Sequence, residues 1–339
     1  SAFQVYDLTG PGAVEFAESL AVNKVDKPVG SSVYTPWLTP DGGFHSDLTM
    51  MRLGEDHVRV VTGVFDGGRD EFWVRKHMPN DGSVTFNNST LDVTTLGLWG
   101  PNAPAVLGEL TGHDLSQEGS PYGSVVDLEI GGMAAKLFRI SYVGDTGWEI
   151  YTDWANGPKL WDLLFEAGES HGIRPTGGGV YGSSGRVEKG YRLMGAELES
   201  EYNPVEAGLA RPKVKAADFI GKEAYLAARE KGPDAICCTF AVDDNTDSQG
   251  RQRFIQGGNA PIVTDAGERI LDSHGRVSVV TTAGNGASYG KYLCLGYLPT
   301  ELAEIGNTFK VMYMNELFPV TVVATTGSAF DPDDTRLKS

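Results

Sequence analysis

Cysteine, histidine and long apolar runs are scarce in this sequence, and each shortage excludes a class of protein. The three cysteines, Cys237, Cys238 and Cys294, are odd in number and include an adjacent pair, which is a poor basis for a disulfide framework. We therefore expect a reducing, cytoplasmic compartment. The six histidines form no pair at metal-ligand spacing on one helix, so no metal site is expected. No apolar run approaches the ~20 residues of a membrane span, so we expect no membrane association.

Positive charge is also scarce. The chain of 339 residues carries 28 Lys and Arg against 45 Asp and Glu, a net charge of −17. Because nucleic acids and anionic membranes bind clustered cations, this balance predicts no nucleic-acid partner. Gly-x-Ser-x-Gly and the phosphate-binding loop with Lys-Ser/Thr are both missing, which argues against serine hydrolases and P-loop enzymes. The length predicts two domains or one elaborate domain, and 40% apolar residues exclude general disorder.

One segment is echoed about ninety residues further along the chain. Leu8-Thr9-Gly10-Pro11-Gly12-Ala13 precedes apolar residues at helical spacing, and so does Leu98-Trp99-Gly100-Pro101-Asn102-Ala103. Each pattern predicts the end of a strand, a Gly-Pro turn and a short helix. Either the likeness is chance, since Gly-Pro turns are common, or it marks two related α+β lobes.

The remaining periodicity predicts a second, β-rich domain after the two lobes. Strands are expected in the lobes at 32–38, 45–53, 58–62, 125–130, 134–140 and 148–152, and helices at 71–78 and 159–168. A Gly-rich segment at 177–191 is expected to enter a helix that ends at Gly190, and 224–231 to form a linking helix. Short apolar runs at 236–242, 276–282, 293–297, 308–314 and 317–324 predict a small antiparallel barrel or sandwich. We place the domain boundary near residue 231, which separates 1–231 from 232–339.

Asp47 is the first candidate for chemistry. It lies on the second strand of a hairpin whose turn is Pro40-Asp41-Gly42-Gly43, and period-two alternation places Asp47 and Thr49 on one face. If that face is exposed, Asp47 is an ordinary solvated hairpin residue. If the face lines a cleft, a buried carboxylate needs a cationic or protonated partner and becomes a candidate acid or base.

Glu149 is the second candidate. It follows a tight loop with two glycines in Arg139-Ile140-Ser141-Tyr142-Val143-Gly144-Asp145-Thr146-Gly147-Trp148-Glu149-Ile150-Tyr151. A carboxylate there is able to accept two parallel hydrogen bonds, such as those that the 2-amino-4-oxo edge of a pterin or guanine donates. The alternative is a plain hairpin in which Trp148 is buried and Glu149 is exposed.

These segments, taken in order, resemble the glycine-cleavage T-protein superfamily over nearly the whole chain. The likeness is carried by Ser32-Val33-Tyr34-Thr35 through Ser46-Asp47-Leu48, by Arg139 to Tyr151, and by five further motifs, Gly185-Arg186-Val187-Glu188-Lys189-Gly190-Tyr191-Arg192, Pro204-Val205-Glu206-Ala207-Gly208-Leu209, Phe219-Ile220-Gly221-Lys222, Asp331-Pro332 and Thr335-Arg336-Leu337. Ser-Tyr-Val-Gly, Gly-Trp-Glu and Glu-Lys-Gly-Tyr-Arg are similar to the tetrahydrofolate-binding portion of dimethylglycine and sarcosine dehydrogenases and oxidases.

The resemblance implies a fold, a cofactor and roles for six residues. It implies two related α+β folate-binding lobes around a central opening, followed by a small antiparallel C-terminal β-barrel, with tetrahydrofolate as cofactor. Asp47 matches the active-site aspartate and Glu149 the glutamate that holds the pterin edge. The other expected folate contacts are Tyr142, Tyr34, Thr49 and Arg186.

Two departures from the family pattern bear on the function. The family has several dozen residues before the strand that matches 4–8, so the chain is either the C-terminal part of a longer polypeptide or has a shortened first lobe. T-proteins carry Arg-Asp-Ser-Leu-Arg where this chain has Gly182-Ser183-Ser184-Gly185-Arg186, which puts the glycine-cleavage reaction itself in doubt. Arg186 is then either a ligand contact or part of an ion pair at the helix surface with Glu188 or a nearby carboxylate.

The leading hypothesis is an enzyme that transfers a one-carbon unit from a methylated or iminium amine to tetrahydrofolate, without a metal. One alternative is a passive folate-binding module of a flavin-linked dimethylglycine or sarcosine oxidase, with a flavin oxidoreductase domain or subunit as partner. Another alternative is a folate-dependent demethylase, which moves a methyl group directly. A purely structural role leaves the grouping of Asp47, Tyr142 and Glu149 unexplained.

Overall fold

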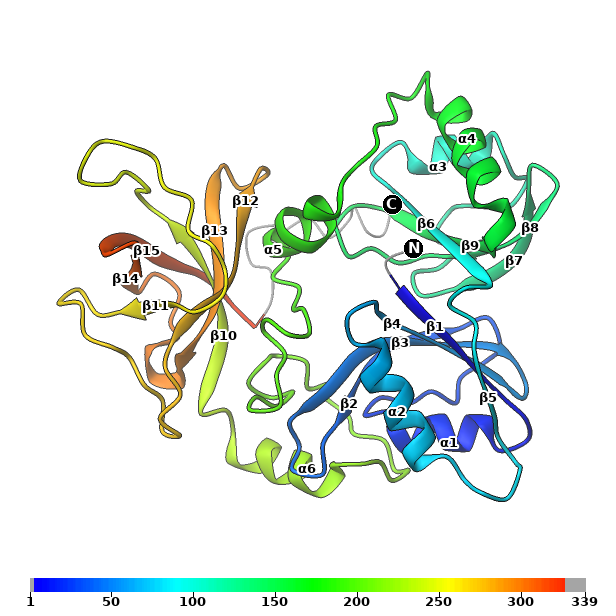
Figure 1. Cartoon of the computed structure of the whole chain (residues 1–339), viewed down its shortest axis with the longest axis horizontal. Helices are drawn as coiled ribbons and strands as arrows, with labels where there is room; N and C mark the ends of the chain where they lie inside the picture. Colours follow the sequence, from blue (N-terminus) through cyan, green and yellow to red (C-terminus); the bar gives the residue numbers. More distant parts are fainter. Residues whose placement is uncertain (1–2, 327–339) are drawn as a thin grey trace.

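The computed structural model describes residues 3–326, which form two α+β lobes and a closed β-barrel (Figure 1). The lobes occupy one side of the view, one above the other, and the barrel lies on the other side. This architecture confirms the expected fold class. The closing motifs Asp331-Pro332 and Thr335-Arg336-Leu337 lie outside the described residues. No helix in the described part of the chain is long and apolar enough to cross a bilayer.

The first lobe is an antiparallel sheet with two helices packed on one face. The sheet has the strand order β2-β3-β4-β1-β5. Leu48 and Met50 point from β3 into the same core as Leu20 of the first helix and Val74 of the second. The elements are β1 (Phe3–Thr9), α1 (Ala13–Leu20), β2 (Ser32–Leu38), β3 (Phe44–Gly54), β4 (His57–Gly63), α2 (Gly67–His77) and β5 (Thr85–Asn88).

The second lobe repeats the topology of the first. Its sheet has the order β6-β9-β8-β7, which matches the order β1-β4-β3-β2 strand for strand. Leu107 and Leu164 bring its two helices onto one face of the sheet, against Ile150. The elements are β6 (Val93–Trp99), α3 (Ala103–Gly108), β7 (Val125–Ile130), β8 (Met133–Phe138), β9 (Gly147–Asp153) and α4 (Gly157–Gly168).

The echoed Gly-Pro segments occupy the same place in both lobes. Gly10 connects β1 to α1 with a φ of 111°, and Gly100 connects β6 to α3 with a φ of 129°. Side chains rarely tolerate these angles, so glycine is needed at both turns. Because the strand, the turn and the helix coincide in both lobes, we interpret the echo as an internal repeat.

The segment between the lobes and the barrel differs from the expected helix. Instead of one helix ending at Gly190, the chain forms a π-helical turn, η2 (Val180–Gly185), and a single α-helical turn, α5 (Arg186–Glu188). π-Helical turns are rare and often occur at functional sites. The expected linking helix is present as α6 (Lys222–Lys231), and the boundary near residue 231 stays a prediction.

The barrel closes six antiparallel strands in the order β10-β13-β12-β11-β14-β15. Closure leaves no strand edge unpaired, so short strands are sufficient. Cys237, Cys238 and Cys294 are buried in this part of the molecule as free thiols. The strands are β10 (Ala235–Val242), β11 (Ala260–Val263), β12 (Val279–Gly286), β13 (Lys291–Pro299), β14 (Thr308–Tyr313) and β15 (Glu316–Thr325).

Candidate functional site

The candidate site lies where the two sheets pack against each other. The faces of the sheets that the helices leave uncovered share an apolar cluster, in which Met51 and Val61 of the first lobe meet Phe138 and Tyr151 of the second. Because side chains alternate along a strand, Asp47 and Thr49 lie on the same face of β3 as Met51. Glu149 likewise lies on the same face of β9 as Tyr151. The two predicted carboxylates therefore project toward the interface between the lobes.

Asp47 is a partly buried carboxyl with a tyrosine partner. Tyr34, on the adjacent strand β2, donates a hydrogen bond from Oη to Asp47 Oδ2 over 3.0 Å. The pKa of Asp47 is raised to about 7, chiefly by burial and to a smaller extent by the charges of Asp66 and Asp70, against the opposing effects of the Tyr34 bond and the charge of Arg186. Asp47 is thus not a freely solvated hairpin residue, and it exchanges protons near neutral pH.

A second buried carboxyl, that of Asp70, is bonded to strand β3 on the face opposite Asp47. Asp70 of α2 is fully buried and accepts hydrogen bonds from Ser46 Oγ at 2.7 Å and Thr62 Oγ1 at 2.6 Å. Burial raises the pKa of Asp70 to about 6. Since Ser46 immediately precedes Asp47, these bonds fix the backbone that carries the candidate acid.

Glu149 is buried, and none of residues 3–326 forms an ion pair with it. Tyr151 donates a hydrogen bond to its Oε2 over 2.5 Å, and within residues 3–326 no donor bonds its Oε1. Burial raises the pKa of Glu149 to about 7, and the bond from Tyr151 opposes this rise only in part. The exposed-hairpin interpretation of Glu149 is therefore wrong, because β9 is covered on both faces. A ligand that donates to Oε1 would stabilise the ionised form.

Tyr142 belongs to a cluster of aromatic rings. The Tyr142 ring lies 5.0 Å from the ring of Tyr181 and stacks on Tyr191 at 5.8 Å, measured between centroids. Tyr181 also lies 5.8 Å from Trp99 and 6.2 Å from Phe3. Burial raises the pKa of Tyr181 well above its usual value, and the charges of Glu149, Tyr142 and Asp47 add to this rise.

Arg186 and Thr49, the other predicted folate contacts, have different surroundings. Arg186 is buried and forms an ion pair with Glu197 at 2.9 Å. It also donates to the backbone oxygens of Gly182 and Tyr191 and to Thr282 Oγ1 of the barrel. The expected surface location of this ion pair is therefore wrong, because both partners are buried, and the bond from Arg186 to Thr282 joins α5 to β12. Thr49 lies opposite Tyr34 in the hairpin register, and its contact with folate stays a prediction.

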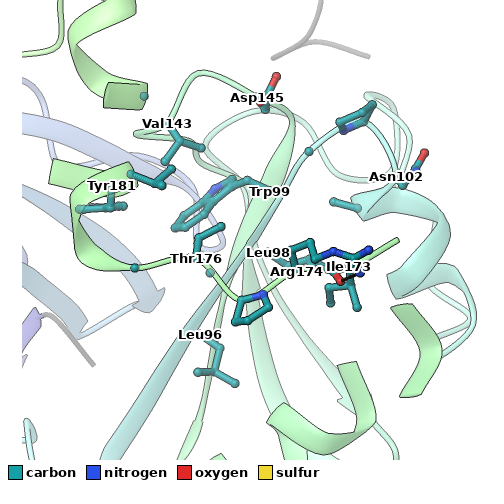
Figure 2. Close-up of a pocket in the computed structure, with 18 of the residues that line it drawn as sticks. Leu96, Leu98, Trp99, Asn102, Val143, Asp145, Ile173, Arg174, Thr176 and Tyr181 are labelled. Carbon is teal, nitrogen blue, oxygen red and sulfur yellow. Dashed lines mark hydrogen bonds between the residues drawn. The ribbon is translucent and has the colours of Figure 1, made fainter. Parts of the chain in front are cut away.

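A cavity of about 680 Å³ lies beside this cluster (Figure 2). Figure 2 shows Tyr181 and Val143 at one end, Trp99 in the middle and Arg174 toward the other end. None of the six predicted site residues lines it, so the cavity adjoins the candidate site through Tyr181. The motifs did not point to Tyr181, because an aromatic residue after a run of glycines has no distinctive pattern.

The raised pKa values of Asp47 and Glu149 predict a pH-dependent stability. A carboxyl whose pKa is about 7 in the folded state and about 4 when unfolded makes folding less favourable as pH rises between these values. At pH 8 the free energy of unfolding of the Asp47→Asn variant should therefore exceed that of wild type by on the order of 1–2 kcal/mol, after discounting for partial exposure. The difference should vanish at pH 4. Thermal melts of both proteins across this range test the sign, and a gap that stays constant with pH contradicts it.

Two repeated α+β lobes, a C-terminal barrel and carboxyl groups between the lobes define a three-part architecture. The family model of the GCVT N-terminal domain matches residues 1–215, and that of the glycine cleavage T-protein C-terminal barrel domain matches residues 253–326. The chain therefore belongs to the glycine-cleavage T-protein family, as the motifs predicted.

The sequence is similar to relatives of two kinds, aminomethyltransferases and dimethylglycine dehydrogenases. It is 30% identical to an aminomethyltransferase of Halalkalibacterium halodurans, over 94% of this chain and 82% of the relative. It is 29% identical to the mitochondrial dimethylglycine dehydrogenase of Homo sapiens, over all of this chain but only 37% of the length of that protein. The crystal structure of aminomethyltransferase T from Bartonella henselae has the same fold, with a TM-score of 0.80 at 24% identity, covering 96% of this chain and 83% of that chain.

Proposed function

We propose that this chain transfers a one-carbon unit from an iminium or N-methylated amine to tetrahydrofolate. The observation that carries the proposal is the environment of Asp47, a carboxyl between the lobes that is bonded to Tyr34 and has a pKa of about 7. An acid or base is most effective when its pKa is near the working pH. Relatives named aminomethyltransferase support the same class of reaction.

The residues around Glu149 fit the pterin ring of tetrahydrofolate. The pterin edge presents two adjacent N–H donors, and Glu149 offers an ionisable carboxylate whose Oε1 has no donor among the described residues. Tyr142 and Tyr181 provide aromatic faces for a flat ring system. Tetrahydrofolate, when bound, supplies the nucleophilic nitrogen that accepts the carbon. Tyr34, Thr49 and Arg186 remain further proposed contacts.

We propose that Asp47 stabilises positive charge on the donor and transfers a proton. Its ionised carboxylate stabilises the positive charge of an iminium donor, and the same group then takes up or returns a proton at its oxygens. Among residues 3–326, only Tyr34 donates to Asp47, so its Oδ1 remains free for the donor. The apolar packing of Met51 against Tyr151 keeps water out of the adjacent interface, which protects an iminium from hydrolysis.

A second candidate is a folate-binding module that does not accelerate the reaction. The chain spans 37–38% of the length of the dimethylglycine dehydrogenases that it matches, which favours a role beside an oxidoreductase. In that case a flavin-linked domain or subunit would generate the one-carbon unit, and this chain would only trap it on folate.

Purified chain distinguishes the two candidates. Formaldehyde and sarcosine condense to an iminium in buffer, and its consumption by tetrahydrofolate is followed by the absorbance of methylene-tetrahydrofolate. We expect the chain to increase the rate at least tenfold over buffer at equal concentrations. Tetrahydrofolate binding in calorimetry without any increase in rate supports the passive module. No binding of tetrahydrofolate contradicts both.

A further inference from the structure

Strand β3 contains a β-bulge directly before Asp47. In the β2–β3 hairpin the register shifts by one residue between Trp37, which lies opposite Ser46, and the next residue of β2, which lies opposite Phe44. His45 is therefore the extra residue of the bulge. Bulges of this kind bend a strand and change the direction of nearby side chains, and they are common next to active sites.

The two residues of the bulge, His45 and Ser46, both face helix α2. The ring of His45 stacks on that of Trp73, with 4.0 Å between the centroids, and its Nε2 lies 3.6 Å from Oδ1 of Asp70. Ser46 Oγ donates to the other oxygen of Asp70, Oδ2, over 2.7 Å. A single side chain of α2 thus contacts both residues of the bulge.

The residues after the bulge alternate regularly between the two faces of the sheet. Leu48 and Met50 pack into the core under the helices, while Met51 packs against the second lobe. Asp47 lies on the face of Met51, and Tyr34 of the neighbouring strand donates to it over 3.0 Å. Because the core fixes Leu48 and Met50, any relaxation of the bulge must be absorbed before them, at Asp47.

Asp70 is well placed to keep the bulge in its conformation. It is fully buried, and Thr62 Oγ1 on β4 donates to the same oxygen, Oδ2, over 2.6 Å. This bond ties the carboxyl to the strand on the other side of β3. A buried acceptor is costly to leave without its donors, so the folded protein keeps these bonds.

We propose that Asp70 is a positioning residue for Asp47: it holds the bulge at His45 and Ser46, and thereby orients the Asp47 carboxyl toward the face shared by the two lobes. The inference rests on the proposed function, and it extends the requirements of that reaction to the helix-covered side of the sheet. A displacement of about 1 Å at a reacting group lowers a rate by roughly 100-fold. Asp70 therefore contributes to the rate without contacting the face on which the reaction takes place.

Single-turnover kinetics of variants at Ser46 and Asp70 tests this assignment. Ser46→Ala removes one bond to the bulge and should lower the rate of one-carbon transfer about tenfold, while the Kd for tetrahydrofolate stays within about twofold. Asp70→Ala removes both contacts and should lower the rate about 100-fold. Asp70→Asn keeps an oxygen that accepts from Ser46 and Thr62, so its rate should stay within about threefold of wild type. Ser46→Ala decides the test if Asp70→Ala does not fold.

Val74→Ala is the matched control for stability. Val74 is a buried apolar residue of the same helix, so its truncation should lower the melting temperature and leave the rate unchanged. Wild-type rates in Ser46→Ala overturn the proposal, and so does an equal loss of rate in Val74→Ala, which would reflect general destabilisation. A loss in Asp70→Asn as large as that in Asp70→Ala also overturns it, because the charge of Asp70 would then matter instead of its bonds.

A crystal structure of Ser46→Ala tests the proposal without any measurement of activity. The Asp47 carboxyl should move beyond hydrogen-bond distance of Tyr34 Oη, and an unchanged bond of 3.0 Å contradicts the positioning role. This second test separates two kinds of failure. If wild type transfers no one-carbon unit, the proposed function is wrong, and the position of Asp47 in the variant structure still decides whether Ser46 and Asp70 orient it.

Discussion

Replacing Asp47 by Asn should lower turnover by ~10²–10⁴-fold, which is the usual loss of rate when a positioned acid or base is removed. The affinity for folate should stay within a few-fold of wild type. The amide keeps the size of the carboxyl and still accepts the hydroxyl of Tyr34, so the hairpin and the pocket should survive. The amide does not ionise, so it neither stabilises the donor cation nor exchanges a proton. Single-turnover kinetics beside an equilibrium folate titration measures both quantities.

A matched control for this variant lies in the same hairpin. Asp41 is exposed in the turn that joins β2 to β3, and Asp41→Asn should change stability by no more than about 0.5 kcal/mol and leave turnover unchanged. If Asp47→Asn behaves like Asp41→Asn in an active protein, Asp47 has no catalytic role. If wild type itself shows no turnover, the passive module is the correct interpretation.

Replacing Glu149 by Gln should weaken folate binding by about 1.5–3 kcal/mol, the range for hydrogen bonds to charged groups, or roughly 10- to 150-fold in Kd. Tyr151 already donates to one oxygen of the carboxylate. In the variant the amide oxygen would keep this bond, so the amide nitrogen would face the donor edge of the pterin. In the variant an amide N–H donor would face an N–H donor of the pterin, whereas in the wild type a carboxylate oxygen accepts from that donor.

Calorimetric titration with tetrahydrofolate measures the effect of Glu149→Gln. Glu129→Gln, an exposed glutamate on β7 of the same sheet, is the matched control and should bind folate like wild type. Folding of the Gln variant is checked by its melting temperature, which should not fall, because a neutral amide avoids the cost of a buried charge. Wild-type affinity in Glu149→Gln would remove Glu149 from the folate site.

Much of the local structure follows from short-range chemistry. Strand β2 (Ser32–Leu38) and strand β7 (Val125–Ile130) begin and end at the predicted residues, since alternation and glycine turns are local signals. The strands β5 (Thr85–Asn88) and β11 (Ala260–Val263) were not predicted, because four residues are too few to establish a period. The π-helical turn at η2 (Val180–Gly185) replaced an expected helix in a segment rich in glycine.

The candidate site depends on contacts that are far apart in the sequence. Motif resemblance selected Asp47, Glu149 and Tyr142, but it did not indicate that Tyr181 would join them. Arg186 was expected either to contact the ligand or to form an ion pair at the helix surface, and it bonds Thr282, which is 96 residues away in the sequence. Such partners are decided by how the lobes and the barrel pack, which no local pattern encodes.

By itself the sequence determined the two α+β lobes, the barrel that follows them, and the hairpin that carries Asp47, because alternation, Gly-Pro turns and residue order are readable along the chain. Only the tertiary structure decided the protonation behaviour of the site. Packing one sheet on the other buries Glu149 and partly buries Asp47, which raises both pKa values to about 7. Burial depends on what covers a strand, and here the cover of each sheet is supplied by the other lobe.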